Sequence, residues 1–160
     1  MQELALAVVG IAGTLLGVVV TAWFARRNAA DARAQEDRRR LRDQRREAVA
    51  SYAQSMIELR RLALHRWHEA ADARDADPAA DTDLLPSTDD NRWARNAAWG
   101  DFFRVRLVWD DPDLVQTAEV LLRRASDLGE QRDRRAMVAE ADAVRAELGT
   151  FTDSVRTRLG

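Results

Sequence analysis

A run of 21 residues without a charged side chain, from Leu4 to Phe24, constrains this chain more than any other feature. As an α-helix the run would be about 31 Å long, which matches the hydrocarbon core of a bilayer. The end of the run carries residue types that favour a membrane interface, namely Trp23, Arg26 and Arg27. We therefore predict a transmembrane helix over residues 4–24.

Two other interpretations of this run fit less well. A cleaved signal peptide has a basic start and a shorter apolar region, whereas residues 1–3 carry no basic side chain. A buried core helix this uniformly apolar would require a large protein around it, and the rest of the chain is rich in Ala, Arg and Asp.

The arginines set the expected orientation in a cell membrane. None precedes the run, and nine lie between residues 26 and 46. Because positive charge favours the cytoplasmic side, we predict residues 1–3 outside and the C-terminal domain in the cytoplasm.

Small residues recur at spacings of three and four within the predicted span, so they share one helical face. GTLLG at residues 13–17 supplies a GxxxG pattern, which permits close packing of two membrane helices. Small residues are also common in membrane helices in general, and both interpretations stay open. The candidate packing residues for a homo-oligomer are Gly10, Gly13, Thr14, Gly17 and Thr21.

Composition excludes several classes of site. The formal charge of −2 creates no global basic field for nucleic acid. The chain has no cysteine, which removes disulfides, thiolate zinc sites and thiol nucleophiles. His65 and His68 lie one helical turn apart, but the segment matches no metal motif. We find no catalytic triad and no nucleotide-binding fingerprint, and we predict no enzyme activity and no cofactor.

Residues 25–47 contain good helix formers and only Leu41 as a sizeable apolar side chain, so we predict a solvated stalk helix that continues the span. Its charge is concentrated in RRRLRDQRR, residues 38–46. Nucleic acid is a possible partner, although arginines on all sides of a helix neutralise phosphates less efficiently than a one-sided stripe. The basic stalk residues are Arg38, Arg39, Arg40, Arg42, Arg45 and Arg46.

Residues 48–160 are predicted to form an antiparallel up-and-down helical bundle, which makes the fold all-α. Apolar stripes with helical spacing begin at Val49, Leu114 and Met137. Seven aspartates and two prolines predict an acidic loop over residues 72–91, with the next helix starting near Asp89 or Asp90. FRVRLVW at residues 103–109 alternates like a strand, but we favour a helix because no second strand candidate exists.

The second bundle helix carries a broad aromatic face that includes Trp93 and Phe103, and this face is the best candidate for the centre of the core. Asp111 and Pro112 are typical of the start of a third helix. The expected core residues are Trp99, Phe102, Trp109, Leu121, Val144 and Leu148.

Four features of the sequence together resemble the KilB-type plasmid-spread proteins of Streptomyces and related actinomycetes. They are the apolar span with GTLLGVVVT, the Arg-rich stalk, ELRRL at residues 58–62 and VRLVWDDPDLVQTAEVLLRRA at residues 105–125. That resemblance implies a membrane-associated protein that assists the intermycelial spread of conjugative plasmids, with no catalytic motif to carry over.

Our first functional hypothesis is a non-enzymatic, single-pass membrane-anchored interaction protein that acts through self-assembly or contact with a transfer ATPase. A holin-like membrane permeabiliser is the second, although such a protein needs no folded bundle. The third is a membrane-tethered nucleic-acid-binding protein, which depends on residues 38–46.

Overall fold

The structure, a computed structural model, describes the backbone of residues 2–131 and 133–159 and the side chains of Trp23, residues 32–131 and residues 133–159. Its backbone forms four α-helices: α1 (Gln2–Ala76), α2 (Pro86–Val108), α3 (Pro112–Asp127) and α4 (Arg134–Leu159). Two short 3-10 helices, η1 (Thr82–Leu84) and η2 (Leu128–Glu130), lie between them. This described backbone contains no strand, so the all-α prediction is confirmed and residues 102–108 are helical.

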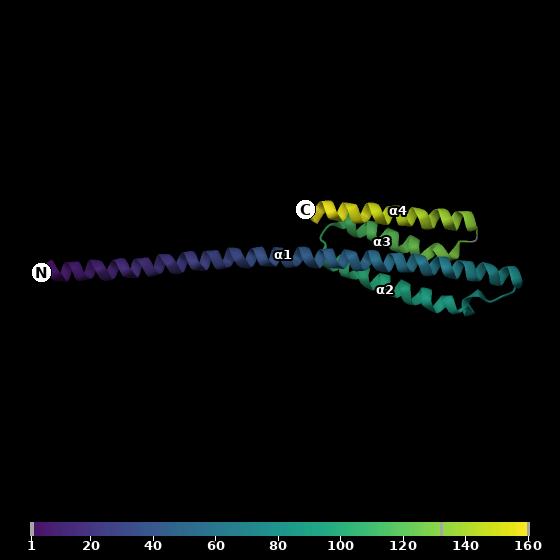
Figure 1. The fold of residues 1–160 in the computed structure, drawn as a ribbon, viewed down its shortest axis with the longest axis horizontal. Helices are drawn as coiled ribbons and strands as arrows, with labels where there is room; N and C mark the ends of the chain where they lie inside the picture. Colours follow the sequence, from purple (N-terminus) through teal and green to yellow (C-terminus); the bar gives the residue numbers. More distant parts are fainter. Residues whose placement is uncertain (1, 132, 160) are drawn as a thin grey trace. The chain divides into compact units, whose positions relative to one another are not determined.

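The chain divides into two compact units, residues 1–41 and residues 42–160. The first unit consists of α1 residues. In the second, the remaining part of α1 and helices α2, α3 and α4 run in alternating directions along one another (Figure 1). This unit is the helical bundle.

Each helix of the bundle places one apolar row in a common core, because positions three and four apart share a helical face. Tyr52 and Met56 of α1 pack with Phe102 of α2, Leu121 of α3 and Phe151 of α4. The buried rows are Val49, Tyr52, Met56, Leu59, Ala63 and Trp67 on α1; Ala94, Ala98, Phe102 and Val105 on α2; Leu114, Ala118, Leu121, Leu122 and Ala125 on α3; and Met137, Ala141, Val144, Leu148, Phe151 and Val155 on α4.

Five of the six residues expected in the core are buried: Phe102, Trp109, Leu121, Val144 and Leu148. Trp99 is half-buried and packs against the core with its ring edge toward Phe102, the ring centroids being 5.6 Å apart. The placement of Trp93 and Phe103 in the core was wrong, because both are exposed. The aromatic residues of α2 cover more of its circumference than one packing face can bury, and the smaller Ala94 and Ala98 take the inner positions.

The predicted acidic loop over residues 72–91 is too long. Helix α1 continues to Ala76 and α2 begins at Pro86, so only residues 77–85 connect them, and η1 occupies part of that connection. Proline is favoured at the first helical position because the missing N–H has no helical partner there. The first turns of α2 also pack on the bundle, with Ser87, Thr88 and Asn91 buried.

The connection between α2 and α3 is set by local chemistry. Helix α2 ends at Val108, and the Asp111 carboxylate caps α3 by accepting hydrogen bonds from the backbone N–H groups of Asp113 and Leu114 at 3.1 and 3.0 Å. These hydrogen bonds, the one from Leu114 first, lower the pKa of Asp111. The prediction of Asp111 as cap and Pro112 in the first turn is confirmed.

Among the residues that the structure describes, no helix has a stretch long and apolar enough to cross a membrane. The predicted span at residues 4–24, with its packing residues Gly10, Gly13, Thr14, Gly17 and Thr21, lies outside the described side chains except for Trp23. Membrane insertion and helix pairing through this face therefore stay predictions.

Candidate interaction surfaces

The basic segment, residues 38–46, is mostly exposed. Arg38, Arg39, Arg40, Arg42 and Arg46 all present their side chains to solvent. Arg40 pairs with Glu36 one helical turn away, with 3.0 Å between Nε and Oε1. Such an exposed pair contributes only a few tenths of a kcal/mol, so it leaves the arginine available for another partner.

Arg45 departs from the prediction of a stalk without a packing face. Its Nε donates a 2.7 Å hydrogen bond to the backbone carbonyl oxygen of Val108 at the end of α2. Its guanidinium lies 5.0 Å from the centre of the Trp109 ring and 3.6 Å from the Asp110 carboxylate. A planar guanidinium can stack and donate at once, so Arg45 fastens α1 to the α2–α3 corner.

The outer face of α2 carries exposed apolar side chains at helical spacing. We call this surface the α2 face and define it by Trp93, Gly100, Phe103 and Leu107. Trp93 is 71% exposed and Leu107 is 83% exposed. Gly100 lies between them, and a Cβ atom added there would meet nothing within 4 Å. The α2 face thus presents three exposed apolar side chains, Trp93, Phe103 and Leu107, with open space above Gly100.

A second surface is a groove between α1 and α4, which we call the α1–α4 groove. It consists of two hollows of about 370 and 430 Å³ that share Ala53 and Thr152. Lining it are Arg46, Val49, Ala50, Ala53, Met56, Ile57 and Arg60 of α1, and Val144, Arg145, Leu148, Gly149, Thr152, Val155, Arg156 and Leu159 of α4. An apolar floor and arginine side chains therefore characterise this groove.

The structure places other charged groups in structural roles. Arg124 of α3 donates to Glu140 and Glu147 of α4, with 2.6 Å between Nε and Glu140 Oε1. The hydrogen bond from Arg124 lowers the pKa of Glu140. This three-residue cluster joins two helices, so its geometry suits stability.

The two histidines do not form a metal centre with their neighbours. His65 and His68 are exposed, and the Trp67 ring stands edge-on to His68 with centroids 5.2 Å apart. In the described parts of the chain, no group of three or more His, Asp and Glu side chains could hold a metal ion.

Sequence reasoning missed both interaction surfaces. The α2 face had a signal, since residues 93, 100, 103 and 107 recur at helical spacing, but Trp93 and Phe103 were assigned to the core. The α1–α4 groove had none, because its two walls lie about 90 residues apart in the sequence.

A comparison with known protein families shows which family the chain belongs to. Residues 46–159 match the KilB plasmid transfer protein family. The chain belongs to this family. The match confirms the resemblance, and it covers the α2 face and the α1–α4 groove of the KilB bundle. It leaves out residues 4–24 and all of the basic segment except Arg46. No match was found among curated proteins or among solved structures.

Proposed function

We propose that this KilB family member is a non-enzymatic, single-pass membrane protein that assists plasmid transfer by binding a protein partner through its bundle. The observation that carries the proposal is the exposed α2 face. Large apolar side chains that a folded domain exposes on one helical face cost solubility, and such a face typically marks an interaction site. Tryptophan and phenylalanine are residue types suited to anchoring a protein contact.

The membrane part of the proposal rests on residues 4–24, whose uncharged length suits a bilayer and whose flanking arginines favour a cytoplasmic bundle. Anchoring restricts the bundle to the membrane surface. Because the bundle and a membrane-bound partner then share one surface, each meets the other at a higher effective concentration.

Two alternatives have weaker support. A holin-like permeabiliser needs no folded domain, whereas this chain buries apolar rows from four helices. Nucleic-acid binding has one favourable observation, the exposed Arg38, Arg39 and Arg40.

Plasmid transfer between mating strains tests the interaction function. In a strain that lacks the gene, we expect Leu107→Ala to restore transfer at least about tenfold less efficiently than the wild-type gene, as for loss of an interface anchor. Leu84→Ala is the matched control, because Leu84 is 80% exposed but belongs to η1 and not to the α2 face. Equal transfer by both variants at equal protein abundance would exclude the α2 face as the site of the partner contact.

Single cysteines test the anchoring, since the chain has none of its own. Thr157 near the end of α4 is exposed and suits the cytoplasmic cysteine. In intact cells, we expect an impermeant thiol reagent to label Gln2→Cys and to spare Thr157→Cys. The reverse pattern would overturn the orientation, and release of the protein from membranes by alkaline carbonate would overturn the anchor.

A further inference from the structure

We propose that the α1–α4 groove is the docking site for an acidic amphipathic helix of a partner protein. This deepens the proposed function by giving a chemistry to the partner, and it rests on that function only in requiring a protein partner. The groove and the α2 face lie on different helices, α4 contributing only to the groove, so the two surfaces can be tested independently.

The dimensions of the groove suit a helix. Its α1 wall runs from Arg46 to Arg60, which is about 21 Å at 1.5 Å per residue. A partner helix of about 14 residues has the same length. Buried apolar side chains, including Met56, Val144 and Leu148, form the floor of the groove. An apolar stripe on the partner helix would pack on this floor and exclude water from it.

Small residues allow a partner backbone to approach closely. Ala53 and Thr152 lie where the two hollows join. Gly149 stands beside them on α4, and a Cβ atom added to it would meet nothing within 4 Å. Ile57 at the rim is 62% exposed although it is a large apolar side chain. Covering Ile57 would remove apolar surface from water, which favours binding.

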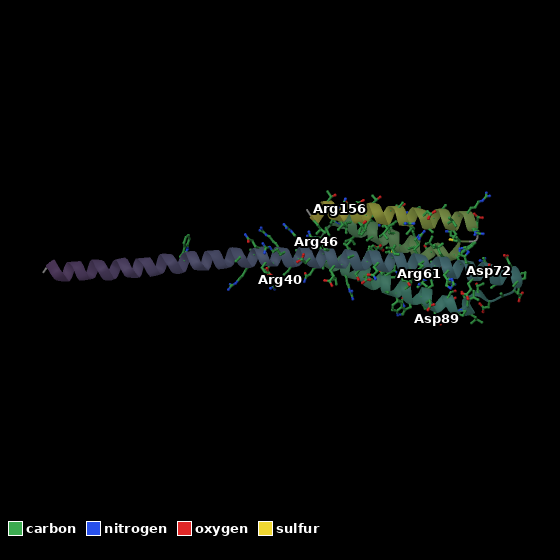
Figure 2. All side chains as sticks on the ribbon, viewed as in Figure 1. Arg40, Arg46, Arg61, Asp72, Asp89 and Arg156 are labelled. Atoms are coloured by element: carbon green, nitrogen blue, oxygen red, sulfur yellow. The ribbon has the colours of Figure 1, made fainter. Side chains whose placement is uncertain are left out.

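The charged lining is entirely basic. Arg46, Arg60, Arg145 and Arg156 line the groove, and none of the described acidic side chains does. Figure 2 shows Arg46 and Arg156 at the same end of the bundle, away from Asp72 and Asp89. Glutamates or aspartates beside an apolar stripe would meet these guanidinium groups, which bind carboxylates in a two-pronged geometry.

The carboxylates next to these arginines do not cancel the basic lining. Arg156 pairs with Asp153 at 3.3 Å and Arg46 with Asp43 at 3.7 Å, each pair lying one turn apart on an exposed surface. Pairs of this kind contribute little and exchange readily with other partners. Arg145 forms no hydrogen bond or ion pair with any residue that the structure describes.

Arg60 differs from the other three arginines because it holds the groove together. Its Nε donates a 2.7 Å hydrogen bond to the backbone carbonyl oxygen of Ala141, and its Nη2 lies 3.2 Å from the Asp142 carboxylate. Arg60 therefore connects α1 to α4 at one end. Substitutions that test binding belong at the exposed Arg145 and Arg156.

Other occupants fit less well. Nucleic acid would leave the apolar floor without a partner, since its phosphates seek charge and water. In a second copy of this chain, the acidic segment between α1 and α2 exposes Leu84 and could supply the ligand. Its helical part, η1, spans only three residues and is too short for the groove. An acidic helix satisfies the length, the floor and the charge together.

The test uses the full-length chain, in buffer or in nanodiscs of zwitterionic lipid as its solubility requires. The probe is a displayed library of helices of about 14 residues, with leucines at positions three and four apart and the remaining positions drawn from Glu, Gln and Lys. We expect selection to enrich glutamate. The enriched peptide, made synthetically, should bind saturably by fluorescence anisotropy and more weakly as salt is raised.

Gly149→Leu fills the groove, and Gly100→Leu is the matched control on the α2 face. Both glycines lie within helices and both have open space for a side chain, so leucine should not destabilise either helix. We expect Gly149→Leu to weaken the peptide at least about tenfold and Gly100→Leu to leave it unchanged. Replacing Arg145 and Arg156 together by Gln should weaken binding and flatten its salt dependence.

Several results would overturn the proposal: enrichment of lysine, no enrichment, or equal binding to the wild type and Gly149→Leu. Two further measurements identify other occupants. Binding to phosphatidylglycerol vesicles that Gly149→Leu abolishes would assign the groove to lipid. Concentration-dependent oligomers that Gly149→Leu dissociates would assign it to a second copy. If Gly149→Leu loses the peptide but supports normal plasmid transfer, the groove proposal stands and the groove is not needed for transfer. The proposed function is contradicted only by normal transfer of Leu107→Ala.

Discussion

The hydroxyl group of Tyr52 on α1 donates a 2.6 Å hydrogen bond to the backbone carbonyl oxygen of Ala118 on α3. The Tyr52 ring also meets Phe151 of α4 edge-on, with centroids 5.7 Å apart. Tyr52 is fully buried, and one side chain thus joins three helices at the centre of the core. Burial raises the pKa of its hydroxyl well above the ordinary value near 10.

We expect Tyr52→Phe to lower the free energy of unfolding by about 1 kcal/mol at neutral pH, because one buried hydrogen bond is lost. The pH dependence gives a sharper test. The unfolded chain releases the tyrosine proton near pH 10 while the folded chain retains it, so wild-type stability falls as pH rises above about 10. The chain has one tyrosine, no lysine and no cysteine, and urea unfolding of Tyr52→Phe should lack this alkaline fall. The same fall in both proteins would contradict the assignment.

Phe102 and Phe103 are adjacent residues of the same type with opposite environments, 1% and 49% exposed. Phe102→Ala should destabilise the bundle by about 3 to 5 kcal/mol, because it empties part of the core. Phe103→Ala should cost much less and serves as the control. Thermal unfolding followed by circular dichroism measures both, and equal costs would show that α2 packs through a different face.

Arg124 should stabilise the bundle more than its neighbour Arg123. Arg124 connects α3 to Glu140 and Glu147 of α4, whereas Arg123 pairs with Glu119 on its own helix. Because Arg124 lowers the pKa of Glu140, its contribution is present above the ordinary glutamate pKa near 4.3 and is lost as pH falls below it. Urea midpoints between about pH 6 and pH 3 should therefore fall more steeply for wild type and Arg123→Gln than for Arg124→Gln. Parallel curves for all three proteins would refute this role.

The basic segment should behave as a solvated helix. We expect the full-length chain to show no salt-sensitive binding to duplex DNA near micromolar affinity at physiological ionic strength. If such binding occurs, changing Arg38, Arg39 and Arg40 to Gln should make the salt dependence shallower by up to about 0.9 per lost phosphate contact. Binding that this triple substitution abolishes would place nucleic-acid recognition ahead of a solvated segment.

The sequence by itself determined most of the secondary structure and the apolar rows of the bundle. Residues such as Tyr52, Met56 and Leu59 share a face whenever the chain is helical, because the spacing depends on helix period and not on a partner. The Asp111 cap is equally local, since its carboxylate reaches backbone N–H groups only two and three residues away. Predictions of this kind needed no knowledge of the packing.

Only the tertiary structure decided which face of α2 is buried and which surfaces of the bundle stay exposed to solvent. Ala94 faces the core and Trp93 faces solvent, although both are apolar, because adjacent residues of a helix point about 100° apart and the neighbouring helices decide which direction is inward. The basic segment likewise contains one arginine, Arg45, that packs on the bundle. The α1–α4 groove combines side chains from two helices that lie far apart in sequence. Its shape and charge exist only once α1 and α4 pack together, since no local pattern sets the distance between two helices.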